Sequence, residues 1–180
     1  MFRSEGNFIY LLFSYNLLRY LTLTLSIFIG TITISENATA NSNRFLSKGL
    51  IVVDLQNGVE WLRCSVGQSY INGSCDGEII QFRFAEIAEI TKLANKELGG
   101  SWRLPTKKEL SSLICEICPP PKIDLKIFPL TSSEPYWTGQ KNWFSSKMYW
   151  SINFMTGYSY SHSFAEKPLA VRLVRDRKSR

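Results

Sequence analysis

Apolar and polar residues alternate along residues 148–164, which predicts a β-hairpin. The turn is expected at Met155-Thr156-Gly157, with the glycine in the left-handed position. The apolar face is then expected to contain Met148, Trp150, Ile152, Phe154, Tyr158, Tyr160, His162 and Phe164. The opposite face is expected to contain Tyr149, Ser151, Asn153, Ser159, Ser161 and Ser163. Such a pattern indicates an antiparallel sheet with one face in solvent.

Two further runs earlier in the chain are typical of strands. Residues 50–54 and 59–64 are rich in β-branched and aromatic residues, and Asn57-Gly58 between them is a strong hairpin signal. Residues 169–175 are expected to form the last strand.

Helical spacing appears twice between these strands. Residues 84–98 place apolar side chains on one face and end at Gly99-Gly100, a frequent helix stop. A second helix is expected after Pro105, because Thr106 and Glu109 form a capping-box pattern. These patterns predict an α+β fold with two helices packed on antiparallel hairpins.

The N-terminal pattern is that of a secretion signal. Arg3 and Arg19 precede an apolar run over residues 20–34, and Ala38-Thr39-Ala40 matches the small-residue cleavage site. We expect a signal peptide over 1–40, a polar leader over 41–49, a domain over 50–176 and a basic tail over 177–180. The alternative is an uncleaved membrane anchor, although about 15 apolar residues fall short of the ~20 that span a bilayer.

Composition and charge change this picture little. The chain has 180 residues and a formal net charge of +6, which suits one globular domain. The basic residues are scattered except near the end of the chain, at Arg172, Arg175, Arg177, Lys178 and Arg180. This charge permits contact with anionic surfaces, but no motif indicates specific nucleic-acid recognition.

Four cysteines follow the expected signal: Cys64, Cys75, Cys115 and Cys118. An even number in an exported domain predicts disulfides, and three pairings are open. The local pairing, Cys64 with Cys75 and Cys115 with Cys118, is preferred here. Two alternatives remain: a redox-active CxxC at Cys115 and Cys118, and one zinc ion held by all four thiolates.

Candidate ligand-binding residues are exposed aromatic and basic side chains near the predicted hairpin: Lys141, Trp143, Lys147 and Tyr149. An aromatic ring beside a cation suits sugars and anionic groups. His162, the only histidine, is expected to be packed among the aromatic residues of the hairpin. We expect no catalytic residues, no metal site and no cofactor, because nucleotide-binding and zinc-protease motifs are missing.

Several segments in order resemble the Lcl C-terminal domain family. They are Gly58-Val59-Glu60-Trp61-Leu62-Arg63-Cys64, Trp102-Arg103-Leu104-Pro105-Thr106, Ile127-Phe128-Pro129, Tyr136-Trp137-Thr138 and Val171-Arg172-Leu173-Val174-Arg175. The resemblance assigns a framework role to Trp61, Trp102, Arg103, Leu104, Pro105, Thr106 and Arg172. At the level of fold, the chain is also similar to the formylglycine-generating enzyme superfamily, which implies a C-type-lectin-like arrangement stabilised by disulfides.

Two departures from these relatives limit what the resemblance implies. No cysteine follows Cys118, so the late active-site pair of the formylglycine-generating enzymes is missing. Glu134-Pro135 is followed by Tyr136 rather than asparagine, so the calcium-dependent sugar motif of C-type lectins is missing too.

Together these features favour a non-enzymatic binding module of the periplasm or cell exterior. Its ligands are expected to be glycans or other anionic envelope or host-surface groups. The alternatives are a periplasmic thiol–disulfide enzyme and a structural subunit of an envelope assembly. Membrane contact is expected only through the N-terminal segment, if that segment is not cleaved.

Overall fold

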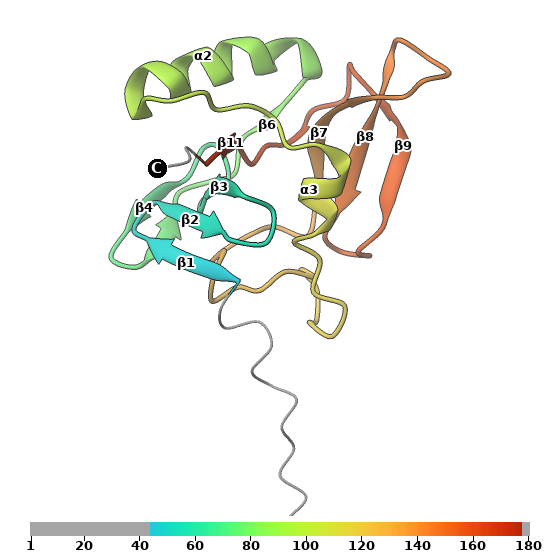
Figure 1. Ribbon diagram of the computed structural model, residues 1–180. Helices are drawn as coiled ribbons and strands as arrows, with labels where there is room; N and C mark the ends of the chain where they lie inside the picture. The colour runs from blue at the N-terminus through green and yellow to red at the C-terminus, as the bar shows by residue number, and fades with distance from the viewer. Residues whose placement is uncertain (1–43, 178–180) are drawn as a thin grey trace, which may run out of the picture. The chain divides into compact units, whose positions relative to one another are not determined.

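The computed structural model describes residues 44–177 of the chain. The expected signal peptide, residues 1–40, lies outside this range, as do the last three residues of the basic tail. Within the described residues the chain forms three β-sheets, one twelve-residue α-helix and two short helical segments (Figure 1).

A four-stranded antiparallel sheet begins the fold. In spatial order it contains β1 (Phe45–Lys48), β2 (Ile51–Asp54), β3 (Val59–Leu62) and β11 (Val174–Asp176). The predicted hairpin is confirmed, because Asp54 pairs with Val59 across a turn in which Gly58 has a φ of 66°. Residues 45–48, expected to belong to a polar leader, instead contribute strand β1 at the edge of this sheet.

A five-stranded sheet carries the C-terminal half. Its order is β6 (Gln81–Phe82), β10 (Leu169–Ala170), β7 (Pro135–Lys141), β8 (Met148–Asn153) and β9 (Ser159–Phe164). Only the β10–β7 pair is parallel among the described strands. A separate two-stranded sheet joins β4 (Ser69–Ile71) to β5 (Ser74–Asp76).

The predicted division of the hairpin into two faces is wrong. Tyr149 and Ser151, expected on the solvent face, are buried. The aromatic residues expected inside are exposed instead: Tyr158, Tyr160, His162 and Phe164. The pairing is also irregular, because Tyr149 lies opposite Ser163 whereas Ser151 lies opposite Tyr160, so β9 contains one extra residue.

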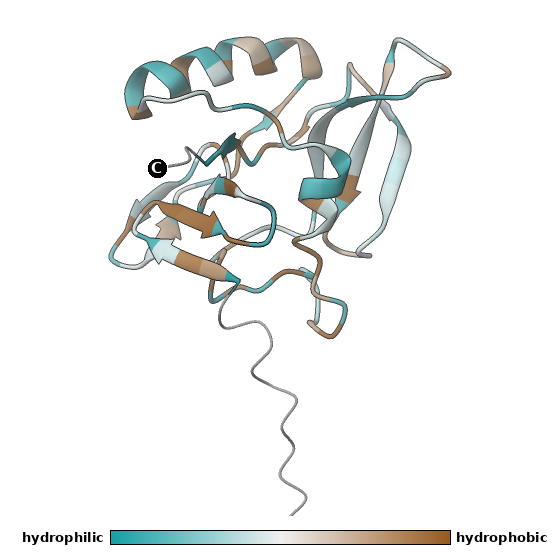
Figure 2. Ribbon diagram, in the orientation of Figure 1, coloured by the Kyte–Doolittle hydropathy of each residue, from teal (hydrophilic) through white to brown (hydrophobic). Residues whose placement is uncertain are grey.

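The first predicted helix is confirmed. A short 3₁₀ segment, η1 (Phe84–Glu86), leads directly into α2 (Ile87–Leu98). Gly99, with a φ of 64°, ends the helix. Helix α2 lies along the outside of the domain (Figure 1), and hydrophilic and hydrophobic residues alternate along its ribbon (Figure 2). Its charged residues Glu89, Lys92 and Lys96 are exposed.

The expected fold class, a C-type-lectin-like α+β arrangement of two helices on hairpins, is wrong. The second helix, α3 (Lys107–Ser111), has only five residues, and the described chain is mainly β-sheet. The capping box starts α3 as predicted, but Ser112 caps its C-terminus. The backbone N–H of Ser112 donates to the carbonyl oxygens of Lys108, Glu109 and Leu110. Pro119-Pro120-Pro121 follows shortly, and proline lacks the N–H that a longer helix would need.

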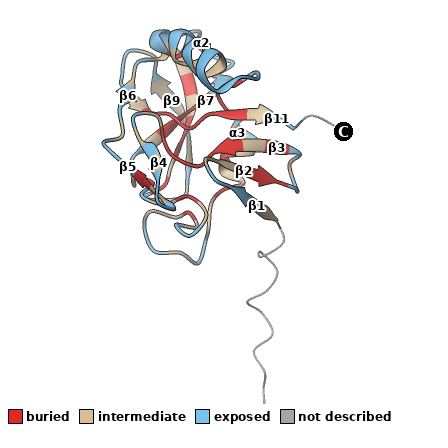
Figure 3. Cartoon of the chain, turned by 90° about the vertical axis from the view of Figure 1, so that its left-hand side faces the viewer, coloured by how far each residue is buried: buried red, intermediate tan, exposed pale blue. Residues whose placement is uncertain are grey.

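Two hydrophobic clusters lie on the two faces of the five-stranded sheet. Tyr136 and Ile152 belong to the cluster that also contains Trp61, while their strand neighbours Trp137 and Tyr149 belong to the cluster beneath α2. Residues 136–138 of strand β7 are therefore buried on both faces, whereas its last three residues, which lead into the next loop, are exposed. Figure 3 shows buried positions concentrated in the central strands.

Candidate functional site

Arg103 joins helix α3 to the last strand. Its backbone exchanges two hydrogen bonds with Val174, of 2.9 and 3.0 Å. Its guanidinium donates to both carboxylate oxygens of Glu109 at 2.9 Å, and it also pairs with Asp176. These contacts give the Arg103 side chain structural partners on two separate elements.

Glu109 is shared between this ion pair and the capping box of α3. Its Oε2 accepts from the Thr106 backbone N–H at 2.7 Å, and its own N–H donates to Thr106 Oγ1 at 3.2 Å. Burial alone would raise the pKa of Glu109, but the hydrogen bonds from Arg103 and Thr106 outweigh burial and hold the pKa below its usual value. The same contacts raise the pKa of Arg103, so the pair stays ionised.

The other framework residues are buried around this junction. Trp61 and Trp102 are fully or almost fully buried, as are Leu104 and Pro105. Trp102 donates from Nε1 to the Gly99 carbonyl at 3.0 Å, which ties the end of α2 to the following strand segment. The motif that resembles the family thus builds the interior rather than a surface.

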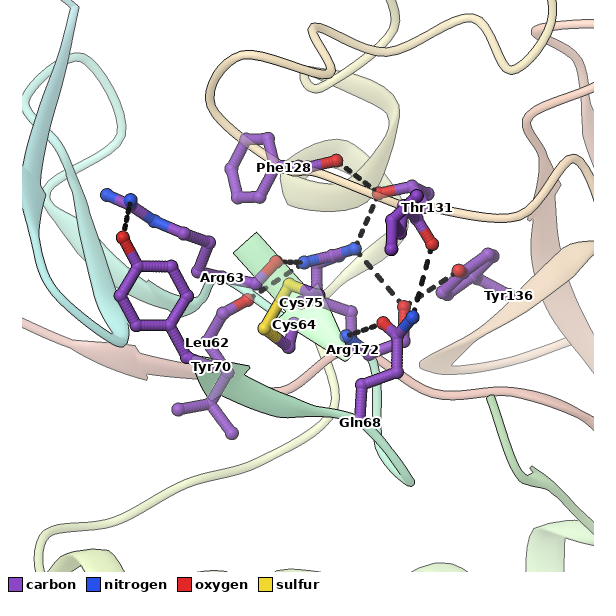
Figure 4. The surroundings of a disulfide bond; sticks show 12 residues. Leu62, Arg63, Cys64, Gln68, Tyr70, Cys75, Phe128, Thr131, Tyr136 and Arg172 are labelled. Carbon is purple, nitrogen blue, oxygen red and sulfur yellow. Dashed lines mark hydrogen bonds between the residues drawn. A yellow bond between two sulfur atoms is a disulfide. The ribbon is translucent and has the colours of Figure 1, made fainter. Parts of the chain in front are cut away.

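Arg172 is a fully buried charged side chain, with 0% exposure, and within residues 44–177 it has no carboxylate partner. It donates to the carbonyls of Leu62 and Arg63, and to the hydroxyls of Ser65 and Thr131 (Figure 4). Burial lowers its pKa, and the neighbouring Tyr136 opposes that effect. One cation therefore holds three segments of the chain together through neutral oxygens.

Beside Arg172 lies the first disulfide, Cys64–Cys75, whose Cα atoms are 5.5 Å apart (Figure 4). Both cysteines are buried, and the bond attaches the β4–β5 hairpin to the end of β3. The neighbouring Arg63 donates to the hydroxyl of Tyr70, the residue opposite Cys75, at 2.7 Å and so holds the same hairpin a second time.

The second disulfide, Cys115–Cys118, closes the CxxC segment. The preferred local pairing is therefore the one in the structure, and no cysteine is free to bind zinc. The CxxC follows the end of α3 at Ser111, so it does not lie at a helix N-terminus, where the dipole would lower a thiol pKa.

A buried ion pair that the sequence analysis missed connects the start of the fold to α3. Arg44 donates to both oxygens of the fully buried Asp54, at 3.0 and 2.7 Å, and also to Ser112. Asn57 donates to the same carboxylate at 2.8 Å. Burial alone would raise the pKa of Asp54, but bonds from Arg44 and Asn57 hold the pKa below its ordinary value.

Three of the four expected ligand-binding residues lie together at the β7–β8 loop. Lys141 ends β7, Trp143 follows it, and Lys147 immediately precedes β8. All three are exposed, and the Trp143 side chain is 84% exposed. Tyr149 is buried and stacks on Phe84 with ring centroids 3.4 Å apart, so it is not exposed to a ligand. It nevertheless lies opposite Lys141, whose Nζ is 5.9 Å from its ring centroid.

Phe144 and Asn142 complete this loop and were missed. Phe144 is 77% exposed, and its ring centroid lies 3.9 Å from that of Trp143. Asn142 is buried and donates to the Ser161 carbonyl at 2.7 Å, while its side-chain oxygen accepts from the Phe144 N–H at 2.8 Å. A polar residue buried in a loop leaves no signal in the hydrophobic periodicity of the sequence. The bond from the Phe144 N–H to the Asn142 side chain is nevertheless an Asx turn, which asparagine favours in loops.

Three cavities of the described part lie elsewhere. One of about 550 Å³ is apolar and lies between α2 and the segment after β3, where Leu93 and Tyr70 line it. One of about 610 Å³ is polar and is lined by Lys48 and Arg175, and one of about 370 Å³ is lined by Arg103 and Gly139. None of the three is lined by residues 141–147.

His162 is exposed rather than packed, and its Nδ1 lies 2.9 Å from Ser161 Oγ. Among residues 44–177 no group of three or more His, Cys, Asp or Glu side chains is placed to hold a metal ion. No helix within the same residues has the length and apolar character needed to cross a membrane.

The comparison with known families agrees with the framework described above. No curated protein sequence matches the chain. Residues 50–175, which run from the start of the β2–β3 hairpin into β11, match the sequence model of the Lcl C-terminal domain. This range contains Arg103, Arg172 and both disulfides, and it covers most of the chain. The chain therefore belongs to the Lcl C-terminal domain family.

Proposed function

We propose that the protein is an exported, non-enzymatic binding module that recognises an anionic ligand of the cell envelope or of a host surface. Glycans are the first ligand class to test. The observation that carries the proposal is the exposed Trp143 side chain in a short loop whose flanking positions in the chain, Lys141 and Lys147, are exposed cations. A ring and two cations in this order suit a sugar face and its acidic substituents.

The charge of the surrounding sheet supports an anionic ligand. No Asp or Glu occurs between Pro135 and Ala165, which covers β7, β8 and β9. Neither Lys141 nor Lys147 takes part in an ion pair of the described residues. Both ammonium groups are therefore available to a ligand without first breaking an internal ion pair, although Lys141 Nζ lies 5.9 Å from the ring centroid of Tyr149.

Binding to heparin and to matched neutral and acidic oligosaccharides, measured at rising salt concentration, tests this proposal. We expect the acidic ligands to bind more tightly and their affinity to fall with salt, because salt screens exposed charges. Trp143→Ala should weaken binding about thirtyfold, the loss expected of an aromatic anchor worth about 2 kcal/mol. The double variant Lys141→Ala with Lys147→Ala should also weaken binding to the acidic ligands. Its matched control is the double variant Lys92→Ala with Lys96→Ala on α2, which should bind as the parent does.

Equal affinity for all of these variants, or no salt-dependent binding to any acidic glycan, would contradict the proposal. The control pair is suitable because Lys92 and Lys96 are exposed and make only long surface contacts with Glu89 and Glu97. Such contacts contribute little to stability, so the two double variants should fold alike.

Export is the second part of the proposal. The two disulfides are compatible with an oxidising compartment, where such bonds form and persist. We further propose cleavage after Ala40, which N-terminal sequencing of the exported protein should show as a chain that begins at Asn41. Recovery of an intact chain in the membrane fraction would indicate an uncleaved anchor instead.

A further inference from the structure

Trp143 and Phe144 form a convex apolar tip. Their side chains are 84% and 77% exposed, and their rings contact each other with an interplanar angle of 41°. Sugar and small-ligand sites are generally concave, with polar groups that converge on the ligand. Residues 141–147 line none of the three cavities, so the two rings offer an exposed apolar surface rather than the lining of one of these cavities.

The foot of this loop is held in place. The buried Asn142 accepts from Phe144, donates to Ser161, and its backbone N–H donates to the Met148 carbonyl at 2.8 Å. Met148 in turn donates to the Ser145 carbonyl at 3.3 Å. The two aromatic rings therefore project from a fixed base, so their exposure does not arise from a freely moving loop.

The cations lie at the base of the same loop. Lys141 is the last residue of β7, and Lys147 directly precedes the first residue of β8. The two lysines therefore lie at the two ends of the loop, and the aromatic residues lie between them in the chain. This order of aromatic tip and cationic base matches the order of a membrane surface, in which tryptophan favours the interface and lysine meets anionic headgroups.

We infer that the anionic ligand of this face is presented on a lipid membrane, with Trp143 and Phe144 inserted at the interface and Lys141 and Lys147 against acidic headgroups. The inference rests on the proposed function and names how the ligand is displayed. It gives the adjacent exposed rings a role that recognition of a soluble sugar does not require, because one ring suffices to stack on a sugar.

Vesicle flotation with tryptophan fluorescence tests the inference. The probes are vesicles of phosphatidylcholine alone, vesicles with added phosphatidylglycerol, vesicles with added lipopolysaccharide, and the soluble oligosaccharide released from that lipopolysaccharide. Trp143 is the only strongly exposed tryptophan of the described residues, because Trp61, Trp102 and Trp137 are buried and Trp150 is half-buried under Lys107. A blue shift of emission on vesicles therefore reports burial of Trp143.

We expect flotation and a blue shift with the anionic vesicles, and neither with phosphatidylcholine alone. Trp143→Ser with Phe144→Ser should reduce partitioning more than about tenfold, since aromatic side chains supply most of the apolar area of an interfacial anchor. Lys141→Ala and Lys147→Ala should each reduce it about fivefold. The matched control is Tyr158→Ser with Tyr160→Ser, two exposed aromatic residues of the β8–β9 turn and β9.

All variants are purified in the same exported form, whose N-terminus is established by sequencing, so any contribution from residues before the described part is common to them. Equal binding to the soluble oligosaccharide, without flotation or a blue shift, would overturn the membrane inference and leave the proposed function intact. Failure to bind either form would overturn both. Flotation on phosphatidylglycerol with no preference for lipopolysaccharide would uphold membrane insertion and refute glycan recognition.

Discussion

The Nη2 atom of Arg172 donates to the Oγ1 atom of Thr131 over 2.8 Å, and both side chains are buried. Thr131 in turn donates to the Phe128 carbonyl at 2.8 Å, so the cation fixes the segment that leads into β7. Because β7 carries the candidate loop at its end, this buried contact connects the family framework with the proposed binding surface.

Replacement of Arg172 by methionine should destabilise the protein by about 3 kcal/mol or more. Methionine fills similar space but leaves the carbonyls of Leu62 and Arg63 and the hydroxyl of Thr131 without their donor, and each unsatisfied buried group costs about 1–3 kcal/mol. Urea denaturation measures the loss. Arg177→Met, at an exposed position, should change the free energy of unfolding by less than about 0.5 kcal/mol. A similar small effect at both positions would refute the structural role of Arg172.

The stability of the protein should decrease in acid through Asp54. Its pKa in the folded state lies below the ordinary value of 3.8, so folding favours the ionised carboxylate. The resulting stabilisation is complete above the unfolded-state pKa and is lost as pH falls through the folded-state pKa. Asp54→Asn should therefore be destabilised at pH 7 and should show a shallower decline of stability below about pH 4, as measured by thermal unfolding across pH. Parallel curves for the two proteins would contradict this assignment.

Glu109 provides a second test, in which the ion pair and the helix cap can be separated. Thr106→Ala removes the N-cap hydroxyl and should cost about 1 kcal/mol at any pH at which Glu109 is ionised. Glu109→Gln keeps the shape of the cap but removes the charge that pairs with Arg103, so its cost should shrink as pH falls. Denaturation of both variants at neutral and acidic pH makes the comparison. A cost for Glu109→Gln that does not change with pH would remove the ion pair from the explanation.

Sequence patterns predicted those elements whose causes are local. The Asn57-Gly58 hairpin, helix 84–98 and the Thr106–Glu109 cap each depend on residues close together in the chain, and each is present. The fold class failed because the five-stranded sheet depends on distant partners, as when β10 pairs with β6 and β7. The burial of Tyr149 and the exposure of Tyr160 and Phe164 likewise depend on which face of that sheet packs on the rest of the domain.

The candidate site shows the same division. Trp143 and the two lysines could be selected because no apolar periodicity required them in a core. Tyr149 could not be placed correctly, since its burial depends on Phe84 from a distant segment of the chain. The role of Asn142 depends on Ser161 in another strand, so only the folded chain shows that the loop is anchored.

The two disulfides should differ in their contribution to stability and in their accessibility. Loss of Cys64–Cys75, with a sequence separation of 11, should cost about 3 kcal/mol in the chain-entropy model, whereas loss of Cys115–Cys118, with a separation of 3, should cost about 1.5 kcal/mol. Cys64 and Cys75 are buried, while Cys115 and Cys118 are half-buried, so mild reductant should open the CxxC bond first. Paired Cys→Ser variants, thiol titration and denaturation measure these differences.

If Cys115→Ser with Cys118→Ser folds and binds as the parent does, the CxxC disulfide has only a local structural role. If the variant instead abolishes a thiol–disulfide exchange activity that the parent shows, the enzyme alternative replaces the binding module as the better account of this chain.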